Sequence, residues 1–101
     1  MDIQTEYIGN TLIVKMKGEI DQSCSSALRL GIDRKIRENH IKNLVLDFGG
    51  VTFMDSSGIG VILGRYKQIK ALGGKTIIVR PQPQVDKILE LSGIKKIMEC
   101  S

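Results

Sequence analysis

A short polar turn near the middle of the chain, Asp55-Ser56-Ser57-Gly58, stands between an apolar strand signal and a helical pattern. The apolar strand signal reaches Phe48, and two glycines then lead toward the turn. The helical pattern begins directly after the turn. A serine in a strand-to-helix turn is lifted to the surface, where the N–H groups and positive dipole end of the helix can receive an anion. The anion could be a substrate oxyanion, a bound phosphate, or a phosphate on the serine itself.

Length and composition favour one folded domain over residues 1–101. A chain of 101 residues buries roughly two-thirds of its unfolded surface, which is enough for one core. Hydrophobic residues make up 42% and charged residues 26%, an ordinary balance that favours neither disorder nor a membrane protein. The first twenty residues include five charged side chains and no long apolar run. We therefore expect no signal peptide, no membrane span and a cytoplasmic location.

Upstream of the turn, the pattern predicts a hairpin and a helix. Residues 3–8 and 11–17 alternate apolar and polar side chains around Gly9-Asn10, a favoured hairpin turn. Helical spacing follows from about residue 23 to residue 39, with Asp21 or Ser23 as the expected N-cap. Gly31 within this helix indicates either close packing on the sheet or a simple weak point.

From residue 41 onward, strands and helices are expected to alternate. Residues 41–48 predict a strand buried on both faces, and the following helix is expected to end at Gly73-Gly74. Residues 76–79 predict a parallel strand, Pro83 is suited to start a third helix, and residues 94–98 form a short helix or edge strand. The third helix is expected to bury its apolar residues, which are Val85, Ile88, Leu89 and Leu91.

This order of elements predicts a single α/β domain. We expect a mixed, mostly parallel sheet of four or five strands with an N-terminal antiparallel hairpin and three to four helices. Sites in such sheets gather beyond the carboxyl ends of the parallel strands. The corner from Glu19 to Asp21 and the turn from Asp55 to Gly58 both follow such ends, so we expect them to be adjacent.

Metal, cofactor and nucleic-acid functions have little support. Cys24 and Cys100 are far apart in the sequence and form no metal motif, and we interpret them as small buried apolar residues. The net charge of +4 comes from separate basic clusters, and the chain has only four aromatic residues, two Tyr and two Phe. A basic stripe with aromatics for stacking bases is therefore missing, so we expect neither a nucleic-acid partner nor a cofactor.

Two catalytic or ligand-binding interpretations of the Asp55–Gly60 turn remain as alternatives. A small serine hydrolase would need a G-x-S-x-G turn, but Met54 stands where its first glycine should be, and the single histidine, His40, precedes the serine. A nucleotide-binding domain would need a recognised glycine spacing, whereas Gly58, Gly60 and Gly64 read G-x-G-x-x-x-G.

A third interpretation is a binding module whose serine is modified by another protein. Periodicity predicts that the helix after the turn buries one stripe of side chains, namely Ile59, Ile62, Leu63, Tyr66 and Ile69. The opposite face then carries Gly60, Val61, Gly64, Arg65 and Gln68. Glycine lowers helix stability, so two glycines one turn apart on an exposed face indicate close approach of another backbone.

The segment from Phe53 to Ile69 closely resembles the phosphorylation segment of anti-sigma factor antagonists, in the STAS-domain family. The resemblance covers nearly the whole chain, through Gly18-Glu19-Ile20-Asp21, Gly73-Gly74 and Leu91-Ser92-Gly93-Ile94. It departs at the end, where some members continue into a further helix.

The resemblance implies a partner switch, and not an enzyme. The unphosphorylated protein would bind an anti-sigma factor that is also a serine kinase, and so release a sporulation sigma factor. The kinase would phosphorylate Ser56, with Ser57 as the second candidate, and a PP2C-type phosphatase would reverse the reaction. Glu19, Asp21 and Asp55 would lie at the docking surface, and the remaining expected partner contacts are Ser57, Gly58, Ile59, Gly60, Val61, Gly64 and Arg65.

Overall fold

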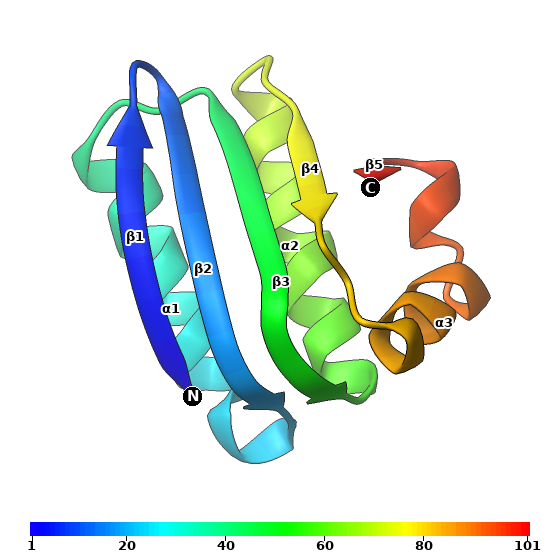
Figure 1. Cartoon of the computed structure of the whole chain (residues 1–101). Coiled ribbons are helices and arrows are strands. Elements are labelled where there is room, and N and C mark those ends of the chain that lie inside the picture. Colours follow the sequence, from blue (N-terminus) through cyan, green and yellow to red (C-terminus); the bar gives the residue numbers. More distant parts are fainter.

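The computed structural model describes all residues from 1 to 101 and contains one five-stranded sheet with its helices (Figure 1). The sheet order follows the sequence: β1 (Asp2–Ile8), β2 (Thr11–Ile20), β3 (Asn43–Met54), β4 (Thr76–Val79) and β5 (Glu99–Cys100). The helices are α1 (Gln22–Glu38), α2 (Ser56–Ala71), α3 (Pro83–Leu91) and the short 3₁₀ helix η1 (Ile94–Lys96). The predicted fold class is confirmed.

β1 and β2 form the predicted antiparallel hairpin, and all other strand pairs are parallel. Gly9 in the turn has a φ of 59°, a left-handed conformation that favours glycine. β3 is longer than predicted, because it continues through Gly49 and Gly50 to Met54. β2 stays paired with it through two register shifts, and this brings the ends of both strands to the same edge of the sheet.

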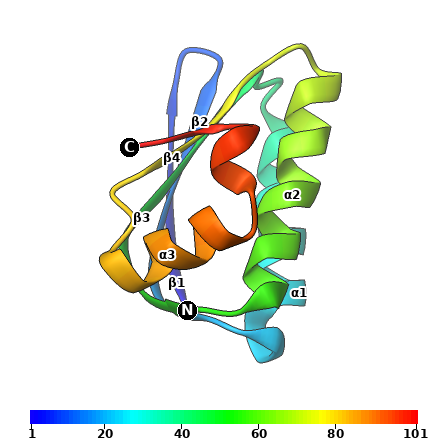
Figure 2. The same ribbon diagram turned by 90° about the vertical axis from the view of Figure 1, so that its right-hand side faces the viewer.

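The helices α1 and α2 cover one face of the sheet and leave the other face open (Figure 2). Each crossover adds its parallel strand on the same side, and crossovers of this kind are right-handed, so successive helices lie on the same face. Leu44 and Leu46 point to the helices and are buried, whereas Val45 between them is half-buried on the open face. The predicted burial of β3 on both faces is therefore wrong.

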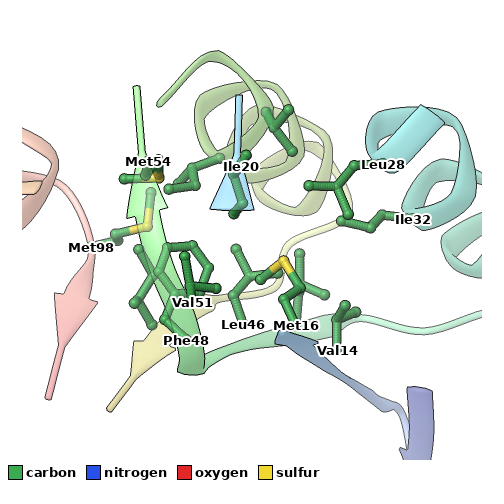
Figure 3. Packing of buried hydrophobic residues seen from close by; sticks show 14 of the residues in the cluster. Val14, Met16, Ile20, Leu28, Ile32, Leu46, Phe48, Val51, Met54 and Met98 are labelled. Carbon is green, nitrogen blue, oxygen red and sulfur yellow. The ribbon is translucent and has the colours of Figure 1, made fainter. Parts of the chain in front are cut away.

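The core lies between the covered face and the helices (Figure 3), where 21 buried apolar residues form one cluster. Leu28 and Ile32 from α1 pack against side chains of β2 and β3. Gly31 on the same helix is exposed, and a Cβ there would touch nothing within 4 Å. Gly31 therefore lowers the stability of the helix and does not serve close packing on the sheet.

The ends of the helices follow their predicted signals. α1 is capped by Asp21, which accepts a hydrogen bond from the Ser23 N–H. α2 ends in a Schellman arrangement, in which Gly73 has a φ of 80° and Gly74 N–H donates to the Ile69 carbonyl at 3.0 Å. The tail contains both predicted alternatives, the short helix η1 and the edge strand β5.

No helix combines the length and the apolar character that a bilayer span requires.

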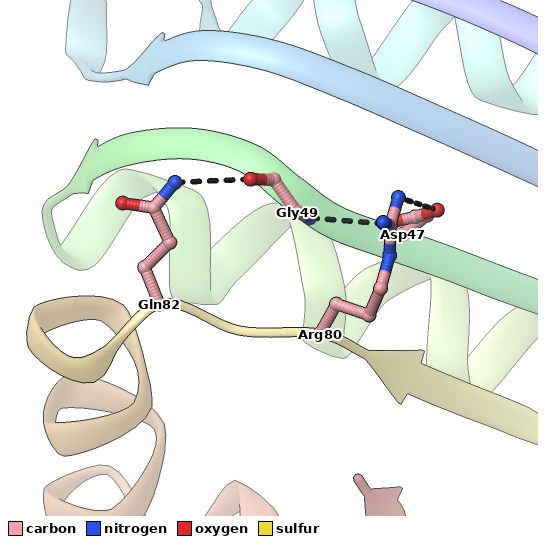
Figure 4. Close-up of polar contacts among 4 residues, drawn as sticks. All are labelled: Asp47, Gly49, Arg80 and Gln82. Atoms are coloured by element: carbon pink, nitrogen blue, oxygen red, sulfur yellow. Dashed lines mark hydrogen bonds and ion pairs between the residues drawn. The ribbon is translucent and has the colours of Figure 1, made fainter.

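The connection from β4 to α3 is tied to β3 by side-chain contacts (Figure 4). Arg80 donates to both carboxylate oxygens of Asp47, at 3.1 and 2.7 Å, and the Gln82 amide donates to the Gly49 carbonyl at 2.9 Å. Partial burial raises the pKa of Asp47, but hydrogen bonds from Arg80 and the Gly49 N–H outweigh it and bring the pKa below its ordinary value. These contacts fix the point where α3 begins.

Candidate functional site

The two polar segments predicted to be adjacent do lie side by side at the carboxyl edge of the sheet. Glu19 pairs with Phe53 and Ile20 with Met54 across β2 and β3. The Asp55 N–H extends this pairing by donating to the Ile20 carbonyl at 3.2 Å. The starts of α1 and α2 therefore form one surface at this edge.

The two helix starts are capped in the same way. Asp21 accepts hydrogen bonds from the Ser23 N–H at 3.0 Å and from the Ser23 hydroxyl at 2.5 Å. Asp55 accepts from the Ser57 N–H at 2.9 Å and from the Ser57 hydroxyl. The Ser23 hydroxyl lowers the pKa of Asp21 from its ordinary value, and the Ser57 hydroxyl does the same for Asp55. Both carboxyls are therefore ionised at neutral pH, and the edge is anionic.

The two serines of the turn differ in their hydrogen bonding. Ser57 is half-buried, and its hydroxyl proton is directed to the Asp55 carboxylate. Ser56 is exposed as the first residue of α2, and its hydroxyl makes no hydrogen bond within the chain. The corresponding first residue of α1 is Gln22, so the first helix position carries a free hydroxyl in α2 only.

The arrangement at Ser56 lacks the parts of a serine hydrolase. The only histidine, His40, lies beside Ala71 and Leu72 at the far end of α2. That helix has sixteen residues and is about 24 Å long at 1.5 Å per residue. No group of three or more His, Cys, Asp or Glu side chains is placed to hold a metal ion. Ser56 is thus positioned to be reached by another molecule, with no base at hand to activate it.

An open groove of about 430 Å³ lies between the start of α2 and the end of α3. It is lined by Asp55, Ser56, Ile59, Ile88, Leu91 and Ser92. The predicted position of Leu91 on the core face of α3 is wrong, because Leu91 is 78% exposed. The contribution of α3 to the edge was missed, since its proximity to Ser56 depends on the β4–α3 connection and leaves no local signal.

α2 is rotated relative to the predicted orientation. Val61 and Arg65, both expected on the solvent-facing partner surface, are only 7% exposed. Gly58 is also buried, and a Cβ there would lie 2.3 Å from Met54 Cγ. The expected contacts that remain accessible are Glu19 and Gly60, which are exposed, and Asp21, Asp55, Ser57, Ile59 and Gly64, which are half-buried.

Arg65 is buried because it pairs with α1. Its Nε lies 2.8 Å from Asp33 Oδ1, and the two side chains are 8% and 17% exposed. The Nε–H is not aimed closely enough at the oxygen to form a hydrogen bond, so the contact is ionic. Burial lowers the pKa of Arg65, and the charge of Asp33 opposes this shift. Arg65 therefore joins two helices and is not available to a partner in this fold.

Comparison of the sequence with known proteins finds a STAS domain over residues 2–101. An anti-sigma F factor antagonist from Paenibacillus polymyxa is 40% identical over 98 residues, which cover 97% of this chain and 84% of that protein. An anti-sigma F factor antagonist from Lysinibacillus sphaericus is 32% identical over 95 residues, covering 93% of this chain and 81% of that protein.

Solved structures agree with the sequence comparison. The anti-sigma factor antagonist SpoIIAA in its unphosphorylated form superposes with a TM-score of 0.86 at 31% identity, covering 99% of this chain and 88% of that one. The Bacillus cell fate determinant SpoIIAA in the phosphorylated form gives a TM-score of 0.77 at 30% identity, with 99% and 91% covered. The fold, the paired helix starts and these matches together show that the chain belongs to the STAS-domain family, among the anti-sigma factor antagonists.

Proposed function

We propose that this protein is an anti-anti-sigma factor switched off by phosphorylation of Ser56. Its unphosphorylated form binds an anti-sigma factor that is also a serine kinase, and thereby releases a sporulation sigma factor. The observation that carries the proposal is the free, exposed hydroxyl of Ser56 at an edge that supplies no catalytic base. The existence of a phosphorylated form of the similar SpoIIAA supports it.

Ser56 is preferred to Ser57 as the acceptor because of how the two hydroxyls are held. Phosphoryl transfer to Ser57 would require breaking its hydrogen bond to Asp55 and exposing a half-buried side chain. Ser56 needs neither step. The kinase brings the catalytic groups, a PP2C-type phosphatase removes the phosphate, and the domain itself catalyses no reaction. All of these components operate in the cytoplasm.

A phosphate at Ser56 acts on binding through charge and leaves the fold intact. The N–H groups of Ser57, Gly58 and Ile59 already have acceptors: Ser57 N–H donates to the Asp55 side chain, and the other two donate to the Asp55 carbonyl. The phosphate therefore projects from the edge and adds about −1.5 to −2 charges beside the ionised Asp55 and Asp21. A resulting shift of ~3 kcal/mol in binding weakens the complex more than a hundredfold.

The test is phosphorylation by the candidate anti-sigma factor/serine kinase with ATP, followed by mass mapping. We expect one phosphate, on Ser56, in the wild type and in Ser57→Ala, and none in Ser56→Ala. Ser56→Ala should still bind the kinase, whereas Ser56→Asp should bind more weakly. Phosphorylation of Ser56→Ala on Ser57 would move the acceptor site by one residue. Turnover of an ester by the isolated protein would instead favour the hydrolase interpretation.

A further inference from the structure

The groove beside Ser56 combines a polar wall with an apolar one. Asp55 and Ser56 form the wall at the start of α2, and Ile59, Ile88 and Leu91 supply apolar surface between α2 and α3. Leu91 is the most exposed large apolar side chain of the molecule, at 78%. An exposed leucine alone is ordinary, but this one borders a concave site that also contains the proposed phosphate acceptor.

The apolar wall is held in place by the packing of α3. Val85 and Leu89 on the same helix are 0% exposed, which fixes its rotation and turns Leu91 outward. The start of α3 is tied to β3, where the Gln84 amide donates to the Thr52 carbonyl at 2.7 Å. An ion pair of 2.7 Å between Asp86 and Lys95 joins α3 to η1. The groove is thus preformed, and a partner need not order it on binding.

We propose that the groove receives an apolar side chain of the anti-sigma factor/serine kinase, with Leu91 as its main contact. This inference rests on the proposed function. A kinase that phosphorylates Ser56 has to bring its active site to the Ser56 hydroxyl, which lies in the wall of the groove. Specific interfaces bury about 800 Å² on each partner, so an interface centred on Ser56 extends over the groove and Leu91.

The groove also gives the phosphate a second way to weaken binding. A phosphate on Ser56 is strongly hydrated, and an apolar side chain can enter beside it only if that hydration is removed. Charge repulsion at an exposed edge decreases with added salt, whereas apolar docking is hardly screened. The contribution of Leu91 to affinity is therefore expected to be the same at low and at high salt.

The experiment compares Leu91→Ala with Leu30→Ala by calorimetric titration of the kinase. Leu30 is a matched control, since it is 59% exposed on α1 and does not line this groove. In Leu91→Ala, loss of the leucine side chain that the partner would bury is expected to weaken binding about tenfold at both salt concentrations. In steady-state phosphorylation, the KM for this protein should rise by a similar factor with kcat unchanged. Leu30→Ala should behave as the wild type, and both variants should melt as the wild type does.

Equal affinities of Leu91→Ala and wild type would overturn the docking role of the groove and leave the partner switch in place. A fall in kcat with unchanged KM would also overturn it, because Leu91 would then act on the transfer step. If the kinase neither binds nor phosphorylates the wild type, the proposed function fails together with this inference.

Discussion

At the scale of single residues, the same residue types serve different roles at the carboxyl edge of the sheet. Ser57 donates its hydroxyl proton to the capping carboxylate, whereas Ser56, one residue earlier, keeps its hydroxyl free. The glycines differ in the same way. Gly58 is needed for packing, because a Cβ would meet Met54 Cγ at 2.3 Å, while a Cβ at Gly60 or Gly64 would touch nothing within 4 Å. The fold alone therefore does not require glycine at the last two positions.

Gly60→Ala and Gly64→Ala test whether these glycines serve the partner. Each change should raise the free energy of unfolding by about 1 kcal/mol, because alanine is the better helix former. Each should also weaken binding of the anti-sigma factor/serine kinase by about tenfold, ~1.4 kcal/mol, because the new methyl group keeps the partner backbone away. Thermal denaturation and calorimetric titration measure the two effects.

Gly31→Ala is the control for these variants, since Gly31 lies within α1 and is equally open. It should stabilise the protein to a similar extent and leave binding unchanged. Wild-type affinity in Gly60→Ala and Gly64→Ala would mean that the partner surface does not include this face of α2.

At the scale of elements, the strand and helix signals were predictable because they are local. The turn at Gly9-Asn10, the N-cap Asp21 and the end of α2 at Gly73-Gly74 depend on neighbours within a few residues. The rotation of α2 was not predictable. Periodicity places an arginine on the solvent-exposed side of a helix. Arg65 is buried because it pairs with Asp33, which is 32 positions away in the sequence.

The residues of the candidate site also fall into two groups, those that local sequence predicts and those whose position depends on tertiary packing. The free serine and both capping carboxylates follow from short motifs, and their adjacency follows from the rule for parallel sheets. The exposure of Leu91 depends on how α3 packs, with Val85 and Leu89 fully buried. A nine-residue helix with four apolar residues does not reveal by sequence alone which of them is left outside.

The pairing of α1 and α2 predicts a structural role for Arg65. Arg65→Ala leaves the Asp33 carboxylate partly buried without its cation, and it should lower the free energy of unfolding by about 3 kcal/mol. Lys67→Ala, at an exposed position of the same helix, should change it by no more than about 0.5 kcal/mol. Chemical denaturation measures both. A stable Arg65→Ala variant with weakened kinase binding would instead support the surface position that periodicity predicted.

At the scale of the whole molecule, the sequential strand order places the candidate site at one edge of the sheet, outside the core. It places α1 and α2 on one face, so the starts of both helices and the end of α3 meet at a single edge. The core of 21 apolar residues lies behind this edge. A charge added at the exposed Ser56 therefore changes the edge without entering the core.

The central claim is that phosphorylation of Ser56 weakens docking without unfolding the domain. The direct measurement is calorimetric titration of the anti-sigma factor/serine kinase with the unphosphorylated protein and with the protein phosphorylated only at Ser56, with circular dichroism melting of both forms. We predict a loss of affinity of about a hundredfold or more, ~3 kcal/mol, with the folded spectrum retained. Equal affinities of two folded forms would contradict the account, as would a phosphorylated form that loses binding only because it unfolds.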